Sequence, residues 1–166
     1  MAQPSPRRPE ELLAGAAQMF SAGRLDEAYR LASAVVQSAP RHPQALRIMG
    51  LSRLRAGRAD LAIAPLERAV SADPRSAIAQ CDLGMALLVA LRLDEAEKHL
   101  EEALRLNPAF PEALINRGIL FAQRAQRAKA IDCYNRALTL RPDFPDALIN
   151  IAMLELEAGL VAEAEA

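Results

Sequence analysis

Residues 107–116 read NPAFPEALIN, and residues 141–150 read RPDFPDALIN. The two stretches start 34 positions apart and share their prolines, the phenylalanine between them and the closing Ala-Leu-Ile-Asn. A phrase that returns at a fixed distance indicates a repeat protein, in which each copy builds the same piece of structure. The same period should therefore be visible in the rest of the chain.

Prolines and glycines follow this period of 34. One series of prolines occupies positions 40, 74, 108 and 142, and a second occupies positions 9, 43, 111 and 145. Glycines fall into two further series, at 50, 84 and 118 and at 23, 57 and 159. The period divides the chain into units 9–42, 43–76, 77–110 and 111–144, followed by a partial unit 145–166.

Each unit is predicted to be a helical hairpin. Apolar and small residues recur at helical spacing in two blocks, in the fourth unit as Leu114, Gly118 and Phe121 and then Ala130, Tyr134 and Ala137. The first proline of each pair cannot continue the preceding helix, whereas the second suits the first turn of the next one. Gly118 and its equivalents lack a Cβ, which lets the two helices approach closely.

These recurring positions resemble the tetratricopeptide repeat family, whose 34-residue pattern combines a Leu-Gly pair, an aromatic residue, alanines and a closing proline. In the third unit the matching residues are Leu83, Gly84, Leu87, Ala96, Leu100, Ala103 and Pro108. In the fourth they are Gly118, Phe121, Ala130, Tyr134, Ala137 and Pro142. The resemblance covers residues 9–166 and implies an all-α fold, a right-handed α-solenoid of tetratricopeptide helical hairpins.

Some residues depart from the pattern. Pro65 lies inside the second helix of the second unit, where it removes a backbone donor, and we expect a kink or a late helix start there. Arg53, Arg117 and Glu155 stand where the family usually has apolar residues. We expect these three positions to be paired or locally loosened.

The charge balance argues against a nucleic-acid partner. The sequence has 20 Lys and Arg and 21 Asp and Glu, which gives a net charge of -1. Nucleic-acid binding instead needs a basic surface. The charge is uneven, because residues 1–75 carry 11 basic and 7 acidic groups and residues 76–166 carry 9 and 14. The N-terminal part is therefore mildly basic and the C-terminal part acidic.

Cysteine usage and apolar runs favour a cytoplasmic protein. Cys81 and Cys133 form no CxxC pair, which argues against a disulfide framework and a zinc site. The longest apolar run, residues 83–91, is far shorter than the roughly 20 residues that span a bilayer. We also expect no export signal, because Glu10 and Glu11 directly precede the first apolar residues.

The two ends of the chain are expected to differ from the units. Residues 1–8, MAQPSPRR, lack an apolar anchor and are predicted to form a disordered Pro-rich tail. In residues 145–166 the second helix is expected to stop after VAEAEA, which leaves the first helix open at Leu148, Ile151, Ala152 and Leu156. We expect this segment to fray or to associate end to end with a second chain.

The sequence carries no catalytic constellation. GxGxxG, GxxxxGK, GxSxG and HExxH are all absent, and the repeat accounts for every glycine except Gly15. His42 and His99 lie in different units, and Glu95 with His99 is typical of a solvated helix surface. The sequence therefore predicts no enzyme, no metal site and no cofactor.

The predicted function is protein binding. Stacked hairpins make a curved surface that suits an extended or helical peptide, and the resemblance implies that the first helix of each unit lines its concave side. The implied groove is apolar and predicts a partner protein or peptide with an apolar or amphipathic segment. Its candidate binding residues are Leu13, Phe20, Arg47, Leu51, Leu54, Met85, Leu88, Ile115, Asn116, Ile119 and Asn150.

Two other functions remain open at this point. The Ala-Leu-Ile-Asn phrases resemble the repeats of O-linked N-acetylglucosamine transferases, whose groove asparagines match Asn116 and Asn150. One alternative prediction is that the chain is the N-terminal repeat region of a larger enzyme, such as a glycosyltransferase or sulfotransferase. A third possibility is a scaffold that only associates with itself.

Overall fold

A computed structural model of the protein describes residues 8–164, with side chains placed for residues 8–157. Within this range the chain forms nine α-helices and no strand. The helices are α1 (Pro9–Ser21), α2 (Leu25–Ser38), α3 (Pro43–Arg55), α4 (Ala59–Ala72), α5 (Ala77–Val89), α6 (Leu93–Leu106), α7 (Pro111–Gln123), α8 (Arg127–Leu140) and α9 (Pro145–Ala164). Apart from Arg8, which directly precedes α1, the predicted disordered tail lies outside the described residues.

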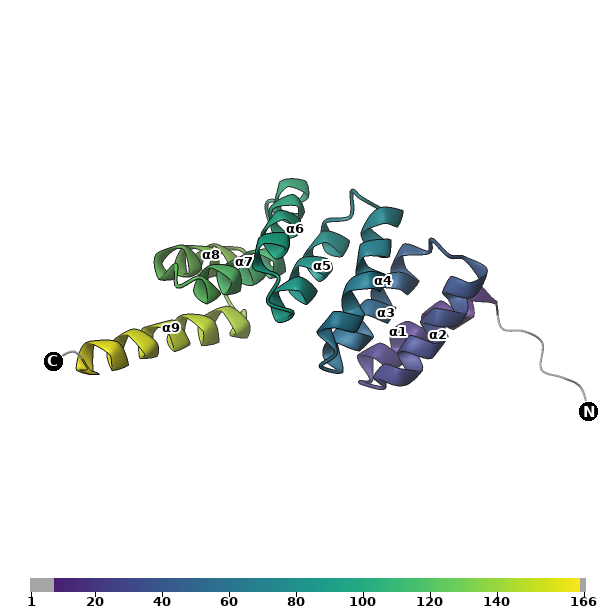
Figure 1. The fold of residues 1–166 in the computed structure, drawn as a ribbon, viewed down its shortest axis with the longest axis horizontal. Coiled ribbons are helices and arrows are strands. Elements are labelled where there is room, and N and C mark those ends of the chain that lie inside the picture. The colour runs from purple at the N-terminus through teal and green to yellow at the C-terminus, as the bar shows by residue number, and fades with distance from the viewer. Residues whose placement is uncertain (1–7, 165–166) are drawn as a thin grey trace, which may run out of the picture.

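Helices α1 to α8 form four hairpins that stack side by side, and α9 packs at the end of the stack (Figure 1). The two helices of each hairpin contact each other, and each second helix also contacts the first helix of the next hairpin. One hairpin falls in each of the four complete sequence units. The predicted all-α solenoid of helical hairpins is therefore confirmed.

The joints between hairpins follow the prolines. Pro9, Pro43, Pro111 and Pro145 are the first residues of α1, α3, α7 and α9, where the missing N–H costs nothing because the first turn has no internal acceptor for it. The other proline series directly follows the C-cap residues Ala39, Asp73, Asn107 and Arg141. Each prolyl ring there prevents the second helix from continuing.

A notch on each of the helices α3, α5 and α7 receives a large side chain from the second helix of its hairpin. A Cβ added at Gly84 would lie 2.8 Å from two carbons of Leu100, and one at Gly118 would overlap the ring of Tyr134. Gly50 meets Leu66 in the same way. Since real Cβ contacts are essentially never this short, these glycines set the distance between the two helices of a hairpin.

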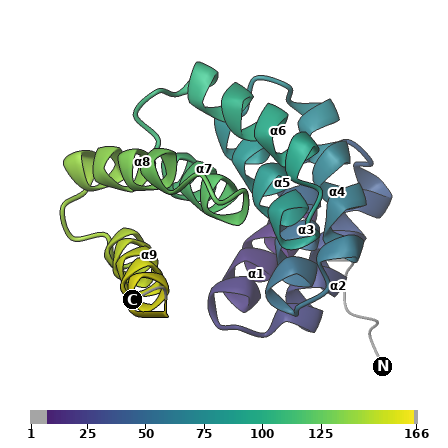
Figure 2. The ribbon, with the colours of Figure 1, turned by 60° about the vertical axis from the view of Figure 1, so that its left-hand side comes forward.

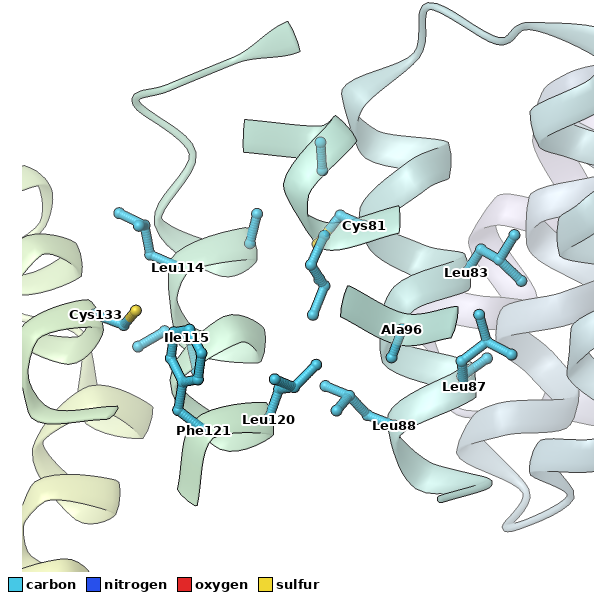
Figure 3. Close-up of a cluster of buried hydrophobic side chains, with 14 of the residues drawn as sticks. Cys81, Leu83, Leu87, Leu88, Ala96, Leu114, Ile115, Leu120, Phe121 and Cys133 are labelled. Carbon is cyan, nitrogen blue, oxygen red and sulfur yellow. The ribbon is translucent and has the colours of Figure 1, made fainter. Parts of the chain in front are cut away.

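The buried side chains form a core that runs along the stack. One cluster extends from the second hairpin to α9, and a smaller cluster fills the first hairpin and its contact with α3. Leu88 of α5 and Leu120 of α7 point toward each other in the larger cluster (Figure 3). Each hairpin is therefore held mainly by its immediate neighbours, as expected for a repeat protein.

The arginines at usually apolar positions are paired. Arg53 lies over the ring of Tyr29, 3.8 Å from its centroid, and Arg117 lies over Phe121 at 5.2 Å. Their guanidinium groups also approach the carboxylates of Asp26 and Glu101, each at 3.8 Å. Aromatic faces attract cations, which lets these two positions accept arginine. Glu155 is exposed.

Of the two effects expected of Pro65, a kink or a late start of α4, the late start is wrong. This helix begins at Ala59, in the same phase as α2, α6 and α8, and contains Pro65 in its interior. Its entry is tighter than in the other units, because the N–H of Leu61 bonds the carbonyl of Arg58 at 3.1 Å, three residues back instead of four. Leu61 is 58% exposed, so water can reach the region where Pro65 removes a donor.

The expected hairpin in the last unit is also wrong. Helix α9 runs without a break from Pro145 to Ala164, past the position of Gly159 where the earlier units turn. The sequence 160–164, LVAEA, consists mostly of strong helix formers. No second helix follows within the described residues, so nothing there packs back on α9 to favour a turn.

The turn inside each hairpin requires a left-handed residue. Gly23 and Gly57 occupy it with φ of 74° and 73°, whereas Leu91 and Ala125 occupy it with φ of 58° and 56°. In every case the following residue donates to the carbonyl five positions back, as Gln126 does to Phe121 at 2.8 Å. Two hairpins therefore hold a side chain in a conformation that favours glycine.

We predict that Ala125→Gly stabilises the protein. Glycine removes the left-handed penalty of about 1 kcal/mol or more but adds freedom to the unfolded chain, so the free energy of unfolding should rise by about 0.5 kcal/mol. The reciprocal control Gly57→Ala should lower it by about 1 kcal/mol. Urea unfolding followed by helical circular dichroism measures both. Changes of the same sign would contradict the prediction.

Candidate functional site: a concave groove

The first helices line the inner side of the stack. Helices α1, α3, α5, α7 and α9 each contact the next member of this series, whereas no second helix contacts another second helix in the described part of the chain. The more closely packed row lies on the inside of a curve, and Figure 2 shows the resulting crescent. This arrangement fits the predicted groove.

A pocket of about 390 Å³ opens on this side between α5, α7 and the start of α9. All of its helical lining residues belong to first helices. Its apolar lining consists of Ile78, Cys81, Met85, Phe110, Ile115 and Phe144. Its polar lining consists of Asp82, Glu112, Asn116 and Asp146. A mostly apolar hollow with a few polar groups is typical of a binding site.

Two pocket residues, Phe110 and Phe144, come from the repeated phrases of the sequence. In the earlier units the equivalent positions are His42 and Ser76, whose side chains accept a hydrogen bond from the backbone N–H three residues on. Phe110 makes no such cap. Helix α7 therefore lacks a contact usually worth about 1 kcal/mol, and the pocket gains an aromatic side chain at that position.

The two asparagines of the repeated phrases bond differently. Asn116 donates from Nδ2 to Sγ of Cys81 at 3.3 Å, whereas Asn150 donates to the backbone carbonyl of Asp146 at 2.7 Å. Burial, with the neighbouring charge of Asp82, raises the pKa of Cys81 to about 12. The thiol is therefore protonated at neutral pH and has no nucleophilic character.

Three carboxylates surround the apolar lining of the pocket. Asp82 pairs with Arg47 of α3 at 2.7 Å, and Glu112 pairs with Arg141 at 2.6 Å. Asp146 is exposed and makes no ion pair with the residues that the structure describes. Burial raises the pKa of Asp82 above its ordinary value, and the charge and hydrogen bond of Arg47 oppose this shift.

The predicted groove residues differ in accessibility. Met85, Ile115 and Asn116 line the pocket, and Arg47 anchors its acidic wall through Asp82. Leu54 and Leu88 are only 9% and 2% exposed, so they support the groove from behind.

The other predicted residues lie away from the pocket. Leu51 and Ile119 are partly buried against the larger core, and Leu13 packs against the smaller one. Phe20 lies beneath the guanidinium of Arg55, 4.8 Å from the ring centroid. Asn150 is partly exposed and is occupied by its own helix backbone. The structure therefore brings only Met85, Ile115 and Asn116 of the predicted set together in one hollow.

Sequence reasoning did not include the aromatic and acidic part of the pocket. Phe110 and Phe144 recur with the period, and Ile78, Glu112 and Asp146 share the second position of their units. The signal was present in the repeated phrases. In those phrases the prolines account for the joints, and nothing in the pattern alone distinguishes a surface phenylalanine from a structural one.

Outside the pocket, the titratable groups that the structure describes include a histidine on α6. His99 Nδ1 lies 2.7 Å from Oε1 of Gln80, and burial lowers the pKa of this histidine. Across residues 8–157, no cluster of three or more His, Cys, Asp or Glu side chains could hold a metal ion. None of the described helices combines the length and apolar character needed to cross a bilayer.

Comparison with known families identifies the class of protein. Two models of the tetratricopeptide repeat match the chain, one over residues 20–77 and the other over residues 111–144. Together they cover more than half of the sequence. The chain belongs to the tetratricopeptide repeat family, as the resemblance implied.

Solved structures agree with this assignment. The thermophilic tetratricopeptide protein TTC0263 of Thermus thermophilus is 26% identical, with a TM-score of 0.83 over 95% of this chain and 86% of that one. MamA is 26% identical, with a TM-score of 0.73 over 90% and 87%. YrrB, a tetratricopeptide protein with an unusual peptide-binding site, is 21% identical and has a TM-score of 0.72 over 84% and 72%, which supports the fold alone.

No curated protein matches the chain. The resemblance to O-linked N-acetylglucosamine transferases therefore stays a prediction, as does the alternative of a repeat region within a larger transferase.

The ion pair in the groove generates a prediction about pH. Arg47→Met leaves the Asp82 carboxylate, whose side chain is only 14% exposed, without its ion-pair partner and should lower the free energy of unfolding by about 2 kcal/mol near pH 7. Loss of Arg47 raises the already elevated pKa of Asp82 further. The loss of folding free energy is therefore largest at neutral pH, where Asp82 is ionised, and it decreases as falling pH protonates Asp82. Urea titrations at about pH 7 and about pH 4 measure the difference.

The double variant Arg47→Met, Asp82→Asn is the matched control for this prediction. Without a carboxylate at position 82, the destabilisation should be smaller and largely independent of pH. A penalty for Arg47→Met that is equal at both pH values would show that Arg47 acts by packing alone.

Proposed function

We propose that the protein is an interaction scaffold that holds a peptide segment of a partner protein by an apolar anchor residue in the α5–α7–α9 pocket. The pocket of about 390 Å³ supports this function, because its apolar side chains come from two successive repeats of one curved surface and Asp146 of the next repeat completes its edge. An apolar anchor bound there contacts two units at once. Fully burying a side chain such as Leu or Phe contributes about 1.5 to 3 kcal/mol.

The charges of the pocket favour a basic residue next to this anchor. Asp82 and Glu112 are already paired within the chain, whereas Asp146 is exposed at the pocket edge. A Lys or Arg of the partner beside Asp146 would add a contact that fades with salt. Such a segment is amphipathic, with an apolar side chain toward the pocket and a cation toward its rim.

We also propose a cytoplasmic setting for this interaction. Cys81 and Cys133 are both buried free thiols. Free thiols are typical of a reducing compartment.

Binding of synthetic peptides tests the proposed function. The probes are short fluorescein-labelled peptides with one Phe or Leu anchor and a neighbouring Lys, compared with peptides in which Ala replaces the anchor or Glu replaces the lysine. Fluorescence anisotropy should give the highest affinity for peptides with both features. Met85→Asp should weaken this binding by about 2 kcal/mol, or about 30-fold, because it places a carboxylate in the apolar lining.

Met19→Asp is the matched control, since Met19 is similarly exposed but lies on α1, away from the pocket. This variant should bind the peptides as the wild type does. Asp146→Asn should reduce the preference for Lys over Glu without removing the need for an anchor. Equal affinity with and without an anchor, or unchanged affinity of Met85→Asp, would contradict the proposal.

A further inference from the structure

Helix α9 exposes an apolar stripe whose equivalents in α3, α5 and α7 are mostly buried. Leu148 and Leu156 are 52% and 65% exposed, and Ala152 between them is exposed as well. The three residues are four positions apart and therefore lie on one face of the helix. Ile149 and Met153, 57% and 55% exposed, widen this apolar face.

The repeat register indicates what this stripe is built for. The glycine at the centre of the equivalent stripe lies against the second helix of the same hairpin in every earlier unit from the second onward. The equivalent residues are mostly buried. They are Leu46, Gly50 and Leu54 in α3, Gln80, Gly84 and Leu88 in α5, and Leu114, Gly118 and Ala122 in α7. All are buried except Ala122, which is partly exposed. The stripe on α9 is therefore a helix-packing surface without a helix on it in the described part of the chain.

The residue at the centre of the stripe selects the kind of helix that fits. Where the notch is glycine, the second helix inserts a large side chain, as Leu100 does at Gly84 with no room for a Cβ. Where the notch is Ala16, in the first unit, the equivalent residue of the second helix is Ala32, and both are fully buried in one cluster. Ala152 therefore requires a helix that presents a small residue at the same level.

Helix α9 itself meets this requirement. Leu148 and Leu156 lie four residues to either side of Ala152, so two antiparallel copies of α9 can cross at Ala152 with their apolar residues in register. We propose that the exposed stripe of α9 packs against α9 of a second copy of this chain, with a two-fold axis near Ala152. Leu148 then lies beside the partner's Leu156.

A head-to-tail stack fits the two ends less well. The free face at the start of the solenoid, on the first hairpin, carries Gln18, Arg24, Glu27 and Arg30 among its surface residues. An apolar stripe placed on this polar end would strip water from charged groups. The basic N-terminal and acidic C-terminal parts would attract each other, but exposed charge pairs contribute little and are screened by salt.

Salt dependence therefore distinguishes the two arrangements. Pairing of α9 with α9 brings the acidic side chains of Glu155 and Glu157 of both copies near one interface, so added salt should strengthen it. A head-to-tail contact between oppositely charged ends should weaken with salt.

Sedimentation of the full chain, from micromolar to several hundred micromolar, tests the pairing. A reversible dimer that becomes tighter with salt is expected. The double variant Leu148→Glu, Leu156→Glu should weaken dimer formation roughly 100-fold, because it places carboxylates in the apolar contact. Leu61→Glu is the matched control, since Leu61 is an exposed helical leucine on α4 at 58%, and it should dimerise as the wild type does.

A cysteine at the proposed axis tests the geometry independently. Ala152→Cys should form an intermolecular disulfide quickly with oxidised glutathione as the oxidant, whereas Leu61→Cys should not. The native Cys81 and Cys133 should not interfere, because both are buried. All variants substitute exposed residues, and helical circular dichroism checks that they fold. The proposal would be overturned if the protein stayed monomeric at every concentration or if the double variant left the dimer unaffected. It would also be overturned if the Ala152→Cys variant cross-linked slowly and salt weakened the dimer.

Discussion

The distance between the two helices of a hairpin is the constraint on which the other features depend. Gly84 and Gly118 leave no room for a Cβ beneath Leu100 and Tyr134, and both large side chains are almost fully buried. With the second helix seated this deeply, the first helices can also contact each other along the stack. The closer packing of the first helices curves the solenoid and places their free faces on its inner side.

The binding pocket arises from the joints of this curved stack. Phe110 and Phe144 stand directly before the prolines that start α7 and α9, at positions where the earlier units carry capping side chains, His42 and Ser76. The same backbone position therefore serves helix capping in two units and supplies pocket surface in two others. Because each repeat has the same fold, such substitutions can change the surface while leaving the architecture unchanged.

The fold could be predicted from the sequence because its signals recur in register. The prolines mark the joints between hairpins, and the glycines mark the notches and the turns. Because these residues recur in several units, the boundaries predicted for one unit agree with those predicted for the others. The pocket was harder to predict, because Leu54, Leu88 and Met85 occupy groove positions by register alone and their exposure depends on local packing. The length of α9 does not follow from the repeat pattern, because Gly159 indicates a turn there and no second helix packs back on α9 within the described residues.

The central claim is that glycine in the notch sets the hairpin geometry, and paired glycine substitutions test it most directly. Gly118→Ala should lower the free energy of unfolding by about 1 to 3 kcal/mol, because the new Cβ overlaps the buried ring of Tyr134. Gly15→Ala, whose Cβ would lie 3.4 Å from Leu31, should instead raise it by about 0.5 to 1 kcal/mol through helix propensity. If urea unfolding shows that both substitutions stabilise the protein equally, the notch does not set the distance between the helices and the account is wrong.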